Sequence, residues 1–308
     1  MAHVQRFSLN GATMGTRYTA VFYAPAATDA DALAAQLFAA VDLVDCQMST
    51  WKPDSDLCRL NATPPGTWVA IPAQLAEVLQ AALQVGAQSR GAFDVTVGAL
   101  VDAWGFGPSQ QRIASPAVAA QPCPGTAAIE LDREHGRVRK HAAVSIDLCG
   151  IAKGYGVDQL AATLERAGIG DYLVGIDGEM RAHGSKPGGQ AWTVAIEKPS
   201  YGLRELAGSM ELMDTAIASS GDYRHWVDVG GQRYAHTMDP ARQQPVANRL
   251  AGVTVLADTC MLADAFATAF MVLGEQDGVQ LARELGMEAL FTVRDGSKLR
   301  EVWVADDQ

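Results

Sequence analysis

The sequence predicts an α+β fold, with mixed sheets and helices packed against them. Short apolar runs typical of strands are interspersed with longer segments whose apolar residues recur at helical spacing. They do not follow a strict strand–helix–strand repeat, which argues against a parallel α/β sheet. Hydrophobic residues make up 48% of the 308 residues and charged residues 19%, enough apolar content for a large core. We expect one domain over 1–308, either undivided or made of two lobes.

In the first half, the spacing predicts helices over 30–46 and 72–88. Strand character is found over 17–23 and 142–148, and a hairpin is expected over 129–138. The segment 109–124 is rich in Pro, Ala and Gln, so we expect a surface excursion with one short helix.

In the second half, helices are expected over 151–166, 259–273 and 277–285, with Gly274 ending the second of them. Strands are expected over 171–176, 192–196, 210–219, 252–256, 290–293 and 301–304. The segment 233–240 should follow a further hairpin.

Composition excludes several classes. The formal net charge of −11 argues against a general nucleic-acid or anionic-membrane binder. The N-terminus lacks a signal peptide and no apolar run reaches membrane-spanning length, which favours a cytoplasmic location; a periplasmic, membrane-anchored one would require a leader removed beforehand. The five cysteines are scattered without a C-x-x-C pair, so we expect mostly buried thiols rather than a zinc site or disulfides.

The stretch 145–158 is the centre of the sequence pattern. A short apolar run over 142–148 carries Asp147, Gly150 marks a turn, and Lys153 falls in the first turn of a helix. Such a helix start suits an anion, because free N–H groups, the helix dipole and the lysine all favour negative charge. The alternative is a strand-to-helix corner with a solvated lysine, and this stretch alone favours that alternative.

Two further segments carry candidate chemistry. Asp264 and Thr268 are four residues apart on an otherwise apolar helix, so their oxygens share one face and suit a hard cation such as Mg²⁺. Alternatively, Asp264 interacts with the helix dipole and Thr268 bonds to the backbone. His236 is a candidate general base in a loop, where most histidines have no such role. Trp51, in the loop 48–55, either stacks on a ligand or packs on the protein beneath it.

Taken together, these stretches resemble the ApbE family, the FAD:protein FMN transferases, from about Thr13 to Gly274. Seven motifs occur in the family's order. They are Thr13-Met14-Gly15-Thr16, Met48-Ser49-Thr50-Trp51 continuing to Asn61, Phe93-Asp94 continuing to Gly107, Asp147 to Tyr155, Ser220-Gly221-Asp222-Tyr223, His236-Thr237-Met238-Asp239-Pro240, and Ala263 to Thr268.

The resemblance implies a two-lobed, T-fold-like architecture with the site between the lobes. It also implies Mg²⁺-dependent transfer of the FMN half of FAD onto a threonine of a partner flavoprotein, with release of AMP. The metal residues would be Gly150, Asp264, Ala267 and Thr268. The FAD pocket would contain Met14, Trp51, Ala92, Phe93, Asp94, Asp147, Lys153 and Met238. Lys153 would also stabilise charge on the phosphoryl oxygens, and His236 would deprotonate the threonine.

Three positions depart from the family pattern. Asp177 and Gln243 replace glycines usual in two turns, and Trp51 replaces a tyrosine. Asp177 adds a carboxylate near the nucleotide, which could weaken FAD binding. Two other functions remain open: hydrolysis of FAD to FMN and AMP, and FAD binding without catalysis.

Overall fold

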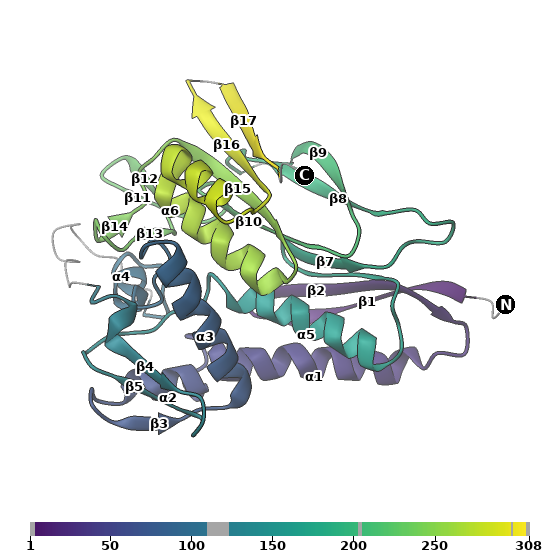
Figure 1. The fold of residues 1–308 in the computed structure, drawn as a ribbon, viewed down its shortest axis with the longest axis horizontal. Coiled ribbons are helices and arrows are strands. Elements are labelled where there is room, and N and C mark those ends of the chain that lie inside the picture. The colour runs from purple at the N-terminus through teal and green to yellow at the C-terminus, as the bar shows by residue number, and fades with distance from the viewer. Residues whose placement is uncertain (1–3, 110–122, 203–204, 297, 306–308) are drawn as a thin grey trace.

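A computed structural model describes residues 4–109, 123–202, 205–296 and 298–305. It confirms the α+β class (Figure 1). Its centre is an eight-stranded sheet with the order β1-β2-β6-β7-β10-β15-β16-β17, in which all neighbouring strands are antiparallel. The strands are β1 (Val4–Thr13), β2 (Thr16–Pro25), β6 (Tyr172–Ile176), β7 (Glu179–His183), β10 (Ala216–Gly221), β15 (Leu250–Ala257), β16 (Ala289–Asp295) and β17 (Lys298–Val304).

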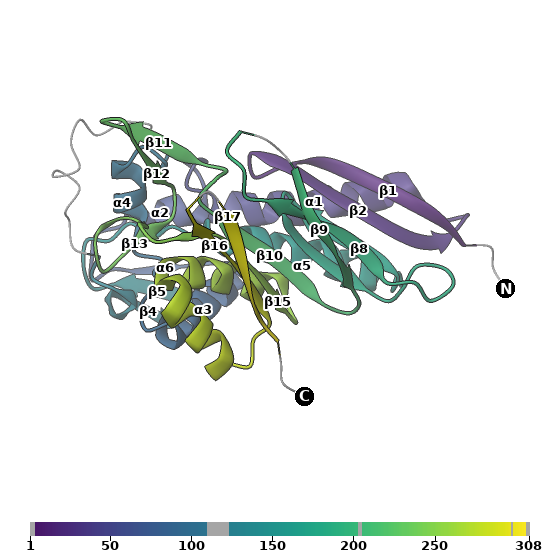
Figure 2. The same ribbon diagram turned by 90° about the horizontal axis from the view of Figure 1, so that it is seen from above.

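Three helices cover one face of this sheet: α1 (Ala30–Met48), α5 (Ala152–Arg166) and α6 (Cys260–Glu284). Alternation along the strands explains the arrangement, because successive side chains point to opposite faces. In β10, Ala216 and Ala218 pack toward the helices, whereas Ile217 packs on the other face. There the hairpin of β8 (Trp192–Lys198) and β9 (Glu205–Leu212) covers the sheet (Figure 2).

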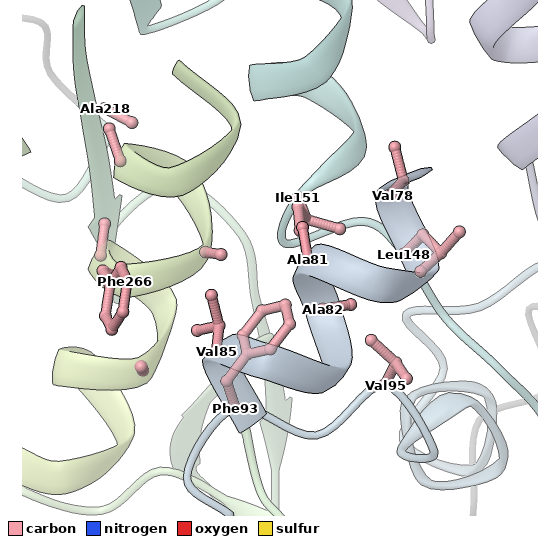
Figure 3. Close-up of a cluster of buried hydrophobic side chains, with 14 of the residues drawn as sticks. Val78, Ala81, Ala82, Val85, Phe93, Val95, Leu148, Ile151, Ala218 and Phe266 are labelled. Atoms are coloured by element: carbon pink, nitrogen blue, oxygen red, sulfur yellow. The ribbon is translucent and has the colours of Figure 1, made fainter. Parts of the chain in front are cut away.

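The remaining elements extend the core beside α6. They are α2 (Asp56–Ala62), β3 (Trp68–Ala70), α3 (Ala73–Gln88), α4 (Gly98–Ala103), a 3-10 turn (Thr126–Ala128), β4 (Ile129–Asp132) and β5 (Arg137–Lys140). Two small hairpins lie nearby: β11 (Trp226–Val229) with β12 (Gln232–Ala235), and β13 (Met238–Asp239) with β14 (Gln244–Pro245). Figure 3 shows Phe93 packed among Val85 of α3, Ile151 and Phe266 of α6. This cluster fixes loops that reach the cavity described below.

Three expectations were wrong, and one strand of the sheet was not predicted. Residues 142–148 form no strand: Val144, Ile146 and Leu148 are buried, but the segment makes only an isolated bridge, which joins Ser145 to Val97. The segment 210–219 belongs to two strands, β9 and β10, separated by a turn in which Asp214 has φ +50°. The strand β1 was not expected at all. The cysteines are not mostly buried, since only Cys260 is.

The long C-terminal helix agrees with the expected break. Gly274 has φ +81° inside α6, and this residue separates two helical segments as the sequence predicts. The expected short helix within 109–124 falls almost entirely outside the described residues. Among the helices that are described, none has the length and apolarity required to span a membrane.

Candidate active site

A cavity of about 840 Å³ opens between the helices, the loops beside α3 and the β11–β12 hairpin. This size lies within the range of small-molecule sites. Twelve of the thirteen residues expected in the site line it: Met14, Trp51, Ala92, Phe93, Asp94, Asp147, Gly150, Lys153, His236, Met238, Asp264 and Thr268. Ala267 is fully buried and does not line the cavity.

Met14 reaches the cavity from the two-residue turn between β1 and β2. Met14 and Gly15 have φ of +46° and +73°, values typical of a type I′ hairpin turn. A non-glycine residue at the first position is strained, and such strain is common at functional sites. The Met14 side chain packs closely against α5, where a Cβ on Gly156 would lie 3.0 Å from Met14 Cε.

The loop before α5 is less open to an anion than the sequence suggests. The N–H of Ala152 donates to the carbonyl of Leu148 at 2.8 Å, and the N–H of Gly154 donates to Asp264 Oδ2 at 3.0 Å. These two N–H groups of the first turn are thus already paired within the protein. Asp147 Oδ1 accepts from the N–H of Cys149 at 2.7 Å, which stabilises the turn itself.

Lys153 supplies a fixed positive charge at the cavity wall. Its Nζ lies 2.6 Å from Glu179 Oε1, and the Glu179 side chain is only 4% exposed. Burial opposes the charge on Lys153, but Glu179 and Asp264 raise its pKa overall, so it stays an ammonium. Sequence reasoning missed Glu179, although an acid beside the glycine of a β-turn was a usable signal.

Asp264 and Thr268 face the cavity from α6. Burial, and then repulsion from Glu179, raise the pKa of Asp264 to about 7. Thr268 Oγ1 lies 3.1 Å from Ser220 Oγ, which belongs to one of the seven motifs but was not expected among the site residues. A Cβ on Gly150 would lie 3.1 Å from Thr268 Oγ1, so the backbone at Gly150 comes close to this hydroxyl.

Asp264 and Thr268 offer oxygen atoms of the kind that Mg²⁺ prefers, and the backbone at Gly150 comes close to the Thr268 hydroxyl. Within the described part of the chain, no three His, Cys, Asp or Glu side chains are grouped so as to hold a metal ion. Protein ligands would therefore be few. That is common for Mg²⁺, which often takes its other ligands from water and substrate phosphates.

His236 follows β12 and lies among other cavity residues. Its ring centroid is 5.4 Å from that of His225 and 6.3 Å from that of Phe106. Nδ1 is buried and has no hydrogen-bond partner in the part of the chain that the structure describes. Burial and the neighbouring His225 lower the pKa of His236 to about 4, so the imidazole is neutral at pH 7.

Trp51 lines the cavity while keeping 51% of its surface exposed. It is therefore not buried against the protein beneath it. Asp94 is more enclosed, and its Oδ1 accepts from both the N–H and the hydroxyl of Thr96 at 2.8 Å. The cavity thus combines apolar and aromatic surface with oriented polar groups, as small-molecule sites generally do.

The two residues in place of glycine both have left-handed backbone. Asp177 and Gln243 each have φ +55°, a conformation that glycine adopts without steric cost. The turn at Gln243 keeps its hydrogen bond, from its N–H to the carbonyl of Asp239 at 2.8 Å. Asp177 Oδ1 pairs with Arg224 Nη1 at 3.2 Å, so its carboxylate is compensated.

One cavity thus brings together a lysine, a buried carboxylate beside a hydroxyl, a histidine and apolar walls, a combination typical of enzyme sites. The profile of the ApbE family matches residues 14–291, and the chain belongs to that family.

The chain is similar to two curated proteins named FAD:protein FMN transferase. Identity is 36% with the one from Vibrio cholerae, over 96% of this chain and 90% of the relative. Identity is 37% with the protein from Haemophilus influenzae, over 93% of this chain and 86% of the relative. Among solved structures, flavin transferase ApbE from Vibrio cholerae superposes with a TM-score of 0.88 at 34% identity, covering 99% of this chain and 98% of the other. The apo form of flavinyl transferase ApbE from Pseudomonas stutzeri superposes with a TM-score of 0.87 at 36% identity, covering 98% of this chain and 95% of the other.

Proposed function

We propose that this protein catalyses Mg²⁺-dependent transfer of FMN from FAD to a threonine of a partner flavoprotein, with release of AMP. The observation that carries the proposal is the convergence of Lys153, Asp264 and His236 on one cavity. The names of the relatives support flavin transfer from FAD to protein. We also propose that 1–308 act as one domain whose two lobes enclose this cavity.

Mg²⁺ would be held by Asp264, Thr268 and backbone oxygens near Gly150 and Ala267, and when bound it would neutralise charge on the phosphates. Burial and the neighbouring Glu179 raise the pKa of Asp264, and a bound cation would offset both effects by favouring the carboxylate form. Lys153 would orient the phosphate and stabilise its charge. Met14, Trp51, Ala92, Phe93, Asp94, Asp147 and Met238 would form the remaining contacts to FAD.

His236 would act as the base. The threonine oxygen forms a bond to the FMN phosphorus while the bond from phosphorus to the AMP oxygen breaks. The hydroxyl proton passes to the imidazole, which is available because His236 is neutral at pH 7. AMP leaves with the electron pair of the broken bond, and a phosphoester joins flavin to protein.

The decisive experiment measures FAD turnover with and without Mg²⁺, in the presence and absence of a protein with an exposed acceptor threonine. AMP release together with flavin that remains on the denatured acceptor is the expected result. AMP and free FMN without labelled acceptor would instead identify a pyrophosphatase. FAD that is bound but unchanged would identify a non-catalytic FAD-binding protein.

A further inference from the structure

The turn between β6 and β7 holds two cations at the cavity wall. Glu179 pairs with Lys153 at 2.6 Å, and two residues earlier Asp177 pairs with Arg224 at 3.2 Å. All four residues line the cavity. The second pair therefore repeats the arrangement of the first, with an acid of the turn fixing a cation that faces the ligand space.

Arg224 is fixed from two sides. Its Nη2 donates to Glu197 Oε2 of β8 at 2.6 Å, while Nη1 lies against Asp177. The guanidinium also covers the turn, since a Cβ on Gly178 would lie 3.3 Å from Nη1. Even so, 31% of the Arg224 side chain is exposed. A planar guanidinium with five donors can bind two carboxylates and still present an N–H to a phosphate.

The charge of the cavity makes this cation important. Among the described residues that line it, Lys153 and Arg224 are the only lysine and arginine. Six acids line it as well: Asp94, Asp147, Asp177, Glu179, Glu197 and Asp264. The excess of acidic side chains would repel a dinucleotide with a charged diphosphate. Each cation that faces the diphosphate should therefore contribute strongly to its binding.

We propose that Arg224 contacts a phosphate oxygen of the dinucleotide substrate, and that Asp177 and Glu197 are positioning residues that hold its guanidinium in place. This inference rests on the proposed function. It also reverses the expected effect of Asp177: the carboxylate strengthens substrate binding by orienting Arg224, which accounts for a left-handed aspartate where glycine would be unstrained.

The test compares dissociation constants for FAD, ADP and riboflavin in EDTA, where no metal-dependent turnover consumes FAD. Arg224→Gln should weaken FAD and ADP binding about 10- to 100-fold, the loss expected for one charge-assisted hydrogen bond. Riboflavin has no phosphate, so its affinity should change less than about twofold. Arg224→Lys should recover part of the loss, because it keeps the charge but not the planar fork.

Asp177→Asn is the sharpest variant, because asparagine tolerates the left-handed backbone and removes only the charge. We expect FAD binding to weaken about 2- to 10-fold, since Arg224 is then held from one side only. Tighter binding would overturn the positioning role. Arg300→Gln is the matched control, because Arg300 pairs with Glu275 away from the cavity.

Two results would overturn the contact between Arg224 and phosphate. One is unchanged FAD and ADP affinity in Arg224→Gln. The other is an equal loss of riboflavin affinity, which would mean that Arg224 supports the structure of the cavity wall rather than contacting phosphate. Failure of the proposed function is seen separately, in the wild type, as bound FAD without flavin on the acceptor. That outcome leaves the measured phosphate contact standing.

Discussion

The N–H of Gly154 donates to Asp264 Oδ2 at 3.0 Å, linking the start of α5 to α6 across 110 residues of sequence. The hydrogen bond requires the two helices to approach closely. A Cβ on Gly154 would overlap the carbonyl oxygen of Cys260 and lie 2.8 Å from Asp264 Cβ. The glycine therefore sets the distance between Lys153, which precedes it, and the carboxylate of Asp264.

Gly154→Ala should consequently lower the free energy of unfolding by about 1–3 kcal/mol, the usual cost of overpacking. Because the overlap separates α5 from α6, FAD turnover should fall even where the protein remains folded. Urea unfolding and a turnover assay measure the two effects. Gly208→Ala is the control, since a Cβ there meets nothing within 4 Å and should change stability by less than about 0.5 kcal/mol. Equal stability of the two variants would contradict the prediction.

Gln243→Gly should stabilise the protein by about 0.5–1 kcal/mol. The gain comes from relief of left-handed strain at φ +55°, partly offset by the greater entropy that glycine gives the unfolded chain. Thermal unfolding should show a small upward shift of the midpoint. Gln243→Ala keeps the strain and serves as control. A lower midpoint for the glycine variant than for the alanine variant would show that the turn is not strained.

Much of the fold could be predicted from the sequence because the helices bury regular apolar stripes. Helix α1 buries Leu33, Leu37, Val41 and Val44, the spacing that identified it. The edge strand β1 could not be predicted in this way, since most of its residues are exposed or half-buried and its pairing comes from β2. Residues 142–148 were misassigned for a different reason: their apolar side chains pack into the core cluster, but the backbone forms only one isolated bridge.

The candidate site, like the fold, contains residues that the sequence predicts and residues that it does not. Asp264 and Thr268 were found because they are four residues apart on one helix face, and Lys153 because it falls in the first turn of a helix after a glycine turn. Glu179 and Arg224 were not found, because each matters through an ion pair with a residue distant in the sequence. Glu179 pairs with Lys153, 26 residues away, and Arg224 pairs with Asp177, 47 residues away. Sequence spacing carries no signal for the pairing itself, although the acid beside the turn glycine marks Glu179 as a candidate. The glycines that Asp177 and Gln243 replace suggested a left-handed backbone at both positions, and the structure gives its φ of +55°.

His236 should keep the proposed reaction active at unusually low pH. Its pKa is lowered to about 4 by burial and His225, so the neutral form persists as pH falls. At pH 5.5 about 3% of such an imidazole is protonated, against about 90% for an unperturbed histidine. The acid limb of the transfer rate at saturating Mg²⁺ and FAD should therefore lie well below pH 6.5. An acid limb centred near 6.5, absent in His236→Gln, would contradict the lowered pKa.

The ion pair of Lys153 and Glu179 should respond asymmetrically to its two single substitutions. Lys153→Gln leaves the buried carboxylate of Glu179 without its cation and removes a charge that favours ionised Asp264, and loss of one partner of a buried pair costs about 3–5 kcal/mol. Glu179→Gln should cost less, because Lys153 still compensates Asp264. Urea unfolding of both variants and of the double variant at pH 7 without Mg²⁺ gives the comparison. If Glu179→Gln were the more destabilising, the charge of Asp264 would not be coupled to Lys153.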